Sequence, residues 1–343
     1  MLENLKTVPL ISVCIPTRNS SNRILGTLSI IESGLSFLPK DTAELIVIDN
    51  ASDQDIKSLI YDYWSRLGDS ISRRLVIENR LGVAFARARG YKECRGSVLV
   101  YCDDDVLPKT DTFQIIMELA LTETKVGGGG GLILPKLVNN AVWPEWIDDR
   151  LKTNLALTIR NDGAFYNPHS SYMPVSALVW FRREALKSWF EMMEHVDFVF
   201  GPSGSQMWRG DDFEMDFHVL QSGWKLKMDQ RLQAFHCIPP ERLTRDYFVK
   251  LIYWNGRTAQ RISNKWRRRS WIYEFLKLFY RVIVKKNPNI INALISYYKN
   301  GVDQAPYVEN GLDDMQFNTK LHEIFQVGLA HEQIHRIMNP MSH

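Results

Sequence analysis

Residues 97–105 read SVLVYCDDD, an apolar run that ends in three consecutive aspartates. Three comparable apolar runs precede it: LISVCIP at 10–16, AELIVIDN at 43–50 and RRLVIEN at 73–79. Helix-like segments separate the runs, at residues 24–35, 56–67 and 83–93. Neighbouring parallel strands need a long crossover connection, so strands that alternate with single helices predict a doubly wound α/β domain with a mostly parallel sheet flanked by helices.

Polar residues close each of the four predicted strands. In open α/β sheets ligands bind beyond the carboxyl ends of the strands, so these closing residues are the first candidates for a site. They are Pro16, Thr17, Arg18 and Asn19 after the first run, Asp49 and Asn79 after the second and third, and Asp103, Asp104 and Asp105 after the fourth. We expect them to converge on one crevice.

The three aspartates at the end of the fourth run are the strongest chemical signal. On an extended backbone Asp103 and Asp105 point the same way, while Asp104 turns aside. Two carboxylates at a strand end suit Mg²⁺ or Mn²⁺ bridging a diphosphate. The alternative is an acidic loop or a helix cap before Pro108, and the sequence leaves both open.

The positions of glycine residues show which kinds of nucleotide-binding loop the sequence contains. An acid at the end of a second strand, such as Asp49, also occurs in dinucleotide-binding folds, but those require a G-x-G-x-x-G turn after the first strand. That turn reads PTRNSS and lacks glycine, which argues against NAD. Residues 127–131 are five glycines with no following Lys-Ser/Thr, so a turn into a strand is favoured over a phosphate cradle.

A second acidic cluster lies at residues 208–217, WRGDDFEMDF, ahead of a helical segment. Either Asp211 or Asp212 is a candidate general base towards an acceptor hydroxyl, or merely a cap of the following helix. Trp208 beside them is a candidate stacking platform for the acceptor, or a core side chain. His236 after the apolar LQAF is a candidate ligand, although a satisfied core histidine is the simpler interpretation.

Composition indicates an ordinary folded protein, because 45% of the 343 residues are hydrophobic and 24% are charged. The four cysteines form no CxxC pair, which favours reduced core thiols over a disulfide or a zinc site. The N-terminal residues show no apolar stretch with a small-residue cleavage site. We therefore expect a cytoplasmic protein.

The net charge of +3 is unevenly distributed, since residues 241–300 carry 14 Lys and Arg against 3 Asp and Glu. We expect a catalytic domain at 1–240 and a mainly helical C-terminal region at 241–343. The apolar segment 271–286 is too short and too charged to cross a bilayer. It is interpreted as a core or homodimer helix, with peripheral association to the inner face of a membrane as the alternative, and nucleic acid is disfavoured.

Five segments together resemble the family-two glycosyltransferases, inverting enzymes of the GT-A fold, over roughly residues 8–260. They are VCIPTRN, similar to the family's first strand and Pro-Thr-x-Asn loop; VIDNASD, similar to its nucleoside-binding segment; NRLGVAFARARG, similar to N-x-G-x-A-x-A-R-N-x-G; YCDDDVLP, similar to its D-x-D metal motif; and WRGDDFEMDF, similar to the G-E-D segment that supplies the base. HCIPPERLT further resembles the tail of a bacterial subgroup.

The resemblance implies transfer of a sugar from a UDP-, GDP- or dTDP-sugar to an acceptor hydroxyl, with inversion and with Mn²⁺ or Mg²⁺. It implies that Asp103 and Asp105, with His236, hold the metal and that Asp212 is the base, with Asp211 in place of the usual Glu. Contacts to the donor are implied for the strand-end residues, for Gly82 and for Arg87, and phosphate contacts for Arg242 and Arg245.

Some positions depart from the family pattern, such as Arg87-Ala88 for Arg-Asn and Ser176-Ala177 in the strand PVSALVWFRRE. These departures concern contacts to the donor sugar more than the metal or the base. Two other functions remain as alternatives: a nucleotidyltransferase that makes a nucleotide-sugar, and an inactive scaffold at a membrane surface.

Overall fold

The computed structural model describes residues 11–68, 70–158, 165–166, 173–196, 206–267, 288, 291, 305, 308 and 311–338. The chain divides into two compact units. The first comprises Met1–Leu137, Leu155–Val199 and Asp211–Ile238, and the second Val138–Asn154, Phe200–Gly210 and Pro239–His343. The second unit therefore takes in two segments from earlier in the chain, whereas the sequence predicts a single division near residue 240.

The first unit is built on one sheet, to which nine of the described strands belong. The strands are β1 (Ile11–Thr17), β2 (Ala43–Asp49), β3 (Ser72–Ile77), β4 (Val98–Cys102), β5 (Val106–Pro108), β6 (Val126–Leu137), β7 (Phe165–Tyr166), β8 (Leu178–Arg182) and β9 (Lys225–Ile238). Their order is β3-β2-β1-β4-β8-β6-β9-β5, and β7 pairs with β9. The first four strands in this order are parallel, and β8 is antiparallel to both its neighbours.

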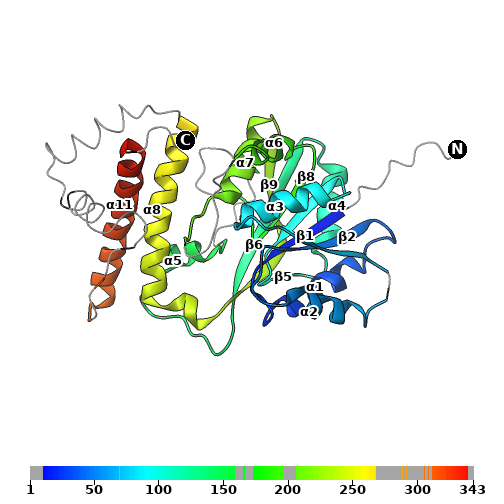
Figure 1. Ribbon diagram of the computed structural model, residues 1–343, viewed down its shortest axis with the longest axis horizontal. Helices are drawn as coiled ribbons and strands as arrows, with labels where there is room; N and C mark the ends of the chain where they lie inside the picture. Colours follow the sequence, from blue (N-terminus) through cyan, green and yellow to red (C-terminus); the bar gives the residue numbers. More distant parts are fainter. Residues whose placement is uncertain are drawn as a thin grey trace. The chain divides into compact units, whose positions relative to one another are not determined.

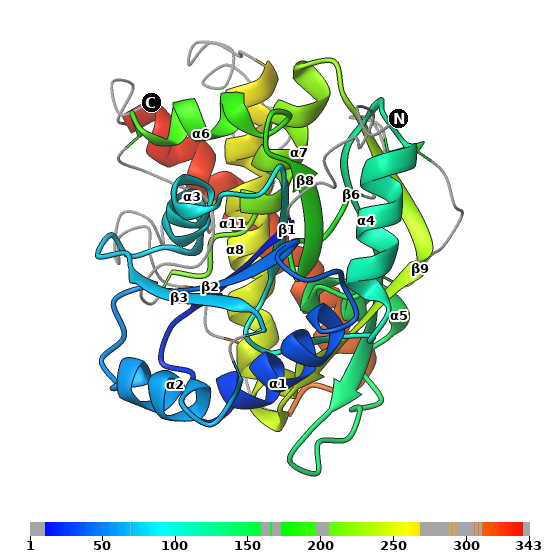
Figure 2. The same cartoon turned by 90° about the vertical axis from the view of Figure 1, so that its right-hand side faces the viewer.

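Helices cover both faces of this sheet, which gives the layered α/β fold predicted from the sequence (Figures 1 and 2). They are α1 (Ile24–Leu35), α2 (Ile56–Trp64), α3 (Val83–Glu93), α4 (Thr112–Thr122), α6 (Lys187–Met193) and α7 (Asp211–Gln221). Helices α3, α6 and α7 share one hydrophobic core, and α1 packs with α4 on the other face. The prediction of an α/β sheet flanked by helices is confirmed.

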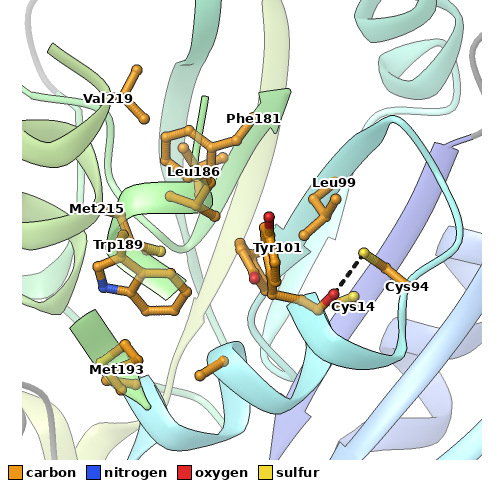
Figure 3. Close-up of a cluster of buried hydrophobic side chains, with 14 of the residues drawn as sticks. Cys14, Cys94, Leu99, Tyr101, Phe181, Leu186, Trp189, Met193, Met215 and Val219 are labelled. Carbon is orange, nitrogen blue, oxygen red and sulfur yellow. Dashed lines mark hydrogen bonds between the residues drawn. The ribbon is translucent and has the colours of Figure 1, made fainter. Parts of the chain in front are cut away.

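The core under α3, α6 and α7 forms because alternate strand residues and one stripe of each helix are apolar. Tyr101 of β4 and Phe181 of β8 are fully buried, and Trp189 of α6 and Met215 of α7 are 1% exposed. Figure 3 shows Trp189, Met215 and Val219 among the side chains of this cluster. The free cysteines Cys14, Cys94 and Cys102 are buried, as the sequence predicts for core thiols.

Most predicted elements are confirmed within a few residues, and the helices at 24–35 and 83–93 are confirmed at both ends. The segment YMPVSALVWF at 172–181 predicts a strand that feeds a helix at 183–189, and both predictions are wrong in position. The strand predicted from residue 172 begins at Leu178, and the helix predicted at 183–189 runs from Lys187 to Met193. Residues 183–186 form turns instead, in which Ala185 and Leu186 both donate to the carbonyl of Arg182.

The prediction of a turn at the five glycines is also wrong, because Gly127–Gly131 lie within β6. A side chain at Gly129 would collide with the carbonyl of Lys227, and one at Gly131 with that of Leu232. Strand β6 carries register irregularities against β9 at this place. The glycines therefore permit close approach of neighbouring strands, and they do not form a phosphate-binding loop.

The second unit contains the short helix α5 (Asp149–Lys152), η2 (Pro240–Leu243) and the long helices α8 (Arg245–Arg267) and α11 (Asp314–Met338). Helix α5 leads into the 3₁₀ helix η1 (Thr153–Leu155), whose last residue belongs to the first unit. Helices α8 and α11 pack closely, with the Tyr253 hydroxyl 2.7 Å from Nδ1 of His331. Within the described residues no helix is both long and apolar enough for a bilayer. The predicted helix 271–286 lies outside the described residues.

Candidate active site

The carboxyl ends of β1, β2 and β3 lie level with one another at one edge of the sheet. In the parallel register Thr17 pairs with Asp49, and Asp49 pairs with Ile77. Pro16 lies one residue earlier in β1, opposite Ile48. The loops that follow these strands are therefore brought together, as the strand-end argument predicts.

Side chains join the loop after β1 to the loop after β2. The Asn19 carboxamide accepts from the backbone N–H of Asp53 at 2.8 Å and donates to its carboxylate at 3.1 Å. The Arg18 guanidinium donates to the carbonyl of Ala51 at 3.3 Å. Asn19 and Ala51 both have positive φ, 50° and 51°, so each loop turns sharply at the strand end. Asp49 supports the second turn by accepting from the Ser52 N–H at 3.1 Å.

Asn50 organises the next loop, and nothing in the sequence analysis singled it out. Its buried carboxamide donates to the carbonyls of Glu78 and Arg80 and accepts from the N–H of Gly82. Gly82 caps α3 at a φ of 136°, a conformation that only glycine adopts readily. Asn79, the residue predicted to contact the donor, is exposed between these anchors.

The three aspartates form a turn between β4 and β5 rather than an extended strand end, so the prediction of an extended backbone is wrong. The turn is closed by the Val106 N–H, which donates to the Asp103 carbonyl at 3.1 Å. Each aspartate consequently faces a different partner. Burial raises the pKa of Asp103 and of Asp104, and the Arg87 guanidinium opposes this rise at Asp103.

Asp104 holds the turn against the end of β1. Its carboxylate accepts from the Thr17 hydroxyl at 2.6 Å and from the Arg23 guanidinium at 2.9 and 3.1 Å. The Thr27 hydroxyl donates to its carbonyl at 2.8 Å. Asp104 is 7% exposed, so these contacts occupy a buried carboxylate. Its geometry is that of a structural anchor, with Arg23 as a partner that the sequence analysis missed.

Asp105 faces His236 of β9. The carboxylate lies 3.4 Å from His236 Nε2, and His236 Nδ1 lies 2.8 Å from the carbonyl of Leu155. The backbone is also joined here, because the Cys237 N–H donates to the Asp105 carbonyl at 2.8 Å. The structure thus brings two of the three predicted metal ligands together.

Arg87 of α3 connects the aspartate turn to the start of α7. Its guanidinium donates to Asp103 at 2.8 Å and forms an ion pair with Asp211. The Arg87 side chain is 2% exposed, and the Tyr101 hydroxyl donates to its carbonyl at 2.8 Å. Asp211 is the first residue of α7, where an acid also suits the helix dipole. Asp212 follows it and accepts from the Phe213 N–H at 2.9 Å.

The acids of this site suit a divalent cation that a ligand helps to hold. Among the described residues, no three His, Cys, Asp or Glu side chains gather closely enough to form a complete metal site. Mg²⁺, however, is commonly bound by one or two carboxylates together with substrate phosphates, and carboxylate with imidazole suits Mn²⁺. Asp103, Asp105 and His236 supply donors of these kinds.

Trp208 and Arg245 have structural partners within the second unit. The Trp208 ring is 3% exposed, packs edge-on against Trp254 and lies 4.8 Å from the Arg257 guanidinium. This geometry favours core packing, the alternative to a stacking platform. The Arg245 guanidinium pairs with Asp314 at 2.7 Å rather than standing open for a phosphate. Arg242 lies in η2, also in this unit.

Comparison with known proteins identifies the family of this chain. The model of glycosyl transferase family 2 matches residues 12–190, which is more than half of the chain. This chain therefore belongs to glycosyl transferase family 2 and has a GT-A-like fold. No curated protein matches its sequence.

Solved structures with a similar fold are distant in sequence. The mannosyltransferase PcManGT from Pyrobaculum calidifontis, in complex with GDP-Man and Mn²⁺, is 16% identical with a TM-score of 0.50, covering 98% of this chain and 77% of that one. S. aureus TarS 1-349 in complex with UDP-GlcNAc is 12% identical with a TM-score of 0.48, covering 96% and 91%. GalNAc-T7 with UDP, GalNAc and Mn²⁺ is 16% identical with a TM-score of 0.47, covering 74% and 51%.

Proposed function

We propose that this protein is an inverting, metal-dependent glycosyltransferase that moves a sugar from a nucleotide-diphosphate sugar to an acceptor hydroxyl. One observation carries the proposal: buried Arg87 pairs with both Asp103 and Asp211. This arrangement holds the aspartate turn, which is proposed to bind the cation at the donor diphosphate, beside α7, the helix that bears the proposed base. Family membership favours sugar transfer over the synthesis of a nucleotide-sugar.

The donor nucleoside is proposed to lie over the ends of β1, β2 and β3. One oxygen of Asp49 is engaged by Ser52, and the described residues supply no partner to the other, which suits an N–H or hydroxyl of a nucleoside. Arg18 and Asn19 shape one wall through Asp53, and Asn79 and Gly82 lie on the loop that forms another. Thr17 acts indirectly, because its hydroxyl is engaged by Asp104.

The diphosphate is proposed to lie beside Asp103 and Asp105, where Mn²⁺ or Mg²⁺ would offset the charge that develops on the leaving group. Asp103, Asp105 and His236 would hold that cation with phosphate oxygens. Asp104 contributes by fixing the turn through Arg23. The complex of PcManGT with GDP-Man and Mn²⁺ supports this class of donor and cation.

Asp212 is proposed to accept the proton of the acceptor hydroxyl as its oxygen attacks the anomeric carbon opposite the leaving diphosphate. A single displacement of this kind inverts the configuration at that carbon. Asp211 is already paired with Arg87, so it is less able to accept a proton, and its role is to hold the helix start. A positioned base of this kind contributes about 10²- to 10⁴-fold to the rate.

The acceptor is proposed to be a hydroxyl of a glycan, a lipid-linked saccharide or a small molecule. The basic segment 241–300 would suit docking of this chain to an anionic membrane surface. Flotation with liposomes that contain or lack anionic lipid tests this docking, which is refuted if the protein floats with neither.

The first experiment is a thermal-shift panel of UDP, GDP and dTDP, each with Mn²⁺ and with EDTA, followed by transfer assays with the matching nucleotide-sugars. A ligand that binds only the folded protein raises its stability, by about 2.7 kcal/mol at a hundred times its Kd. We expect one nucleotide to give a shift that EDTA removes, and NMR of the product to show inverted configuration. No shift with any nucleotide, together with no transfer, would overturn the proposal.

A further inference from the structure

Asp216, one turn after the proposed base on α7, is a buried acid that the proposed reaction does not use. Its side chain is fully buried, and within the part of the chain that the structure describes neither carboxylate oxygen has a hydrogen-bond partner. Burying a polar group without a partner is unfavourable. A polar residue retained at such a position is therefore a candidate for a functional role.

The surroundings of Asp216 favour its neutral form. Burial raises the pKa of the Asp216 carboxyl well above its usual range, and the charge of Asp212 raises it further. Asp212 is the group whose charge acts on Asp216, and among the described residues no cation lowers the pKa of Asp216. A neutral carboxylic acid carries an O–H group, which an ionised carboxylate lacks, and can donate one hydrogen bond.

Helical spacing places Asp216 on the same side of α7 as Asp212. Residues four apart in a helix have Cβ atoms about 5–6 Å apart, which is within reach of two carboxyl groups. Met215 and Val219 of the same helix face the core formed with Trp189, as Figure 3 shows. Asp216 and Asp212 thus lie along the border of that core, Asp216 fully buried and Asp212 partly exposed.

Two ionised carboxylates cannot hydrogen-bond to each other, because both are acceptors. A hydrogen bond between Asp212 and Asp216 requires a proton on one of them, and the more deeply buried of the two is the one that keeps it. The Asp212 oxygen Oδ1 is engaged by the Phe213 N–H. Its second oxygen is the one left to receive the O–H.

We propose that Asp216 is a positioning residue of the base: its carboxylic acid O–H donates to the Asp212 carboxylate and holds that carboxylate in one orientation. The proposal rests on the proposed function of Asp212.

The test compares two variants. Asp216→Leu removes the hydrogen-bond donor but keeps a side chain of similar size, and Asp216→Asn keeps an N–H hydrogen-bond donor without a charge. In the Leu variant we expect kcat to fall about tenfold or more, as expected for a misplaced acid–base group, with little change in the donor KM. Asp216→Asn should restore most of the lost turnover.

A second readout does not depend on transfer. Infrared spectroscopy of the wild type at neutral pH should show a protonated carboxyl band that is absent from Asp216→Asn. Gln221→Ala, an exposed change at the end of the same helix, is the matched control and should leave kcat and the band unchanged.

The outcomes separate the two proposals. If the wild type transfers sugar but Asp216→Leu matches it in kcat, or the wild type lacks the band, the inference is wrong and the proposed function stands. If the wild type transfers no sugar from any donor, the proposed function fails, and the positioning role fails with it even where the infrared band persists.

Discussion

The Arg87 guanidinium and the Asp211 carboxylate form an ion pair in which both side chains are buried, 2% and 9% exposed. The same guanidinium donates to Asp103 at 2.8 Å. Three segments far apart in the sequence, namely α3, the aspartate turn and the start of α7, are therefore joined through one cation. Removal of this cation leaves Asp103 and the buried Asp211 without the partner that they share, and their like charges then repel each other.

Substitution of Arg87 by Met should strongly destabilise the first unit. Breaking a buried ion pair by removing one partner costs about 3–5 kcal/mol, because the remaining charge stays buried without compensation. Urea unfolding followed by circular dichroism measures the loss. Arg89→Ala is the control on the same helix: its pair with Glu93 is partly exposed, so the loss should be no more than about 0.5 kcal/mol. Equal losses in both variants would contradict the bridging role of Arg87.

Asp212→Asn should remove catalysis while leaving donor binding intact. We expect kcat to fall about a hundredfold or more, because a positioned base contributes on that scale, while the metal-dependent thermal shift with the nucleotide persists. Asp211→Asn differs in kind, since it weakens the pair with Arg87 and should lower the free energy of unfolding as well. Turnover of Asp212→Asn near that of the wild type would show that another residue is the base.

The sequence predicted the parts of the site that depend on strand ends. Asp49 and the three aspartates close apolar runs, and the parallel register brings Thr17 and Asp49 level. It left open whether the aspartates extend the strand or form an acidic loop, because three acidic residues after an apolar run are compatible with both. The roles of Arg23 and Asn50 were missed as well, because each depends on partners more than 25 residues away in the chain.

The glycine run at 127–131 shows why other features could not be predicted. Glycine is common in turns because it adopts positive φ freely. A glycine in a strand can instead allow a neighbouring strand to approach closely, and the sequence alone does not distinguish these two reasons for its presence. The reason becomes visible only when the carbonyls of Lys227 and Leu232 are seen against Gly129 and Gly131. Similarly, the burial of Trp208 depends on Trp254 of α8, which no local pattern near Trp208 reveals.

Gly256→Ala should destabilise the second unit, because α8 and α11 approach each other through glycine. A side chain at Gly256 would meet the carbonyl of Phe325, and one at Gly328 that of Tyr253. Overpacking of this kind costs about 1–3 kcal/mol, measurable as a lower midpoint of thermal or urea unfolding. Gly26→Ala in α1 has open space around it and should instead gain about 0.5–1 kcal/mol from helix propensity. A neutral or stabilising Gly256→Ala would contradict the close helix contact.

Stability should fall in acid partly through Glu44, a core carboxylate that is 1% exposed at its side chain. Burial by itself would raise the pKa of Glu44, but hydrogen bonds from Ser12 at 2.6 Å and from Arg95 at 2.7 and 2.9 Å outweigh it and lower the pKa. A carboxyl with a lowered folded-state pKa stabilises the protein above its unfolded pKa. This contribution should therefore be complete at neutral pH and be lost as the pH falls below 4.5, the ordinary value for Glu.

Glu44→Gln makes the pH dependence measurable. At pH 7 we expect it to lose about 1.5–3 kcal/mol of unfolding free energy, the scale of hydrogen bonds to a charged group. The difference between variant and wild type should shrink as the pH falls below 4.5, because the wild-type carboxylate is then protonated too. Glu191→Gln, whose pair with Lys187 is exposed, should show a small and nearly pH-independent change. A Glu44→Gln deficit that stays constant from pH 7 to well below 4.5 would show that shape rather than charge makes this residue stabilising.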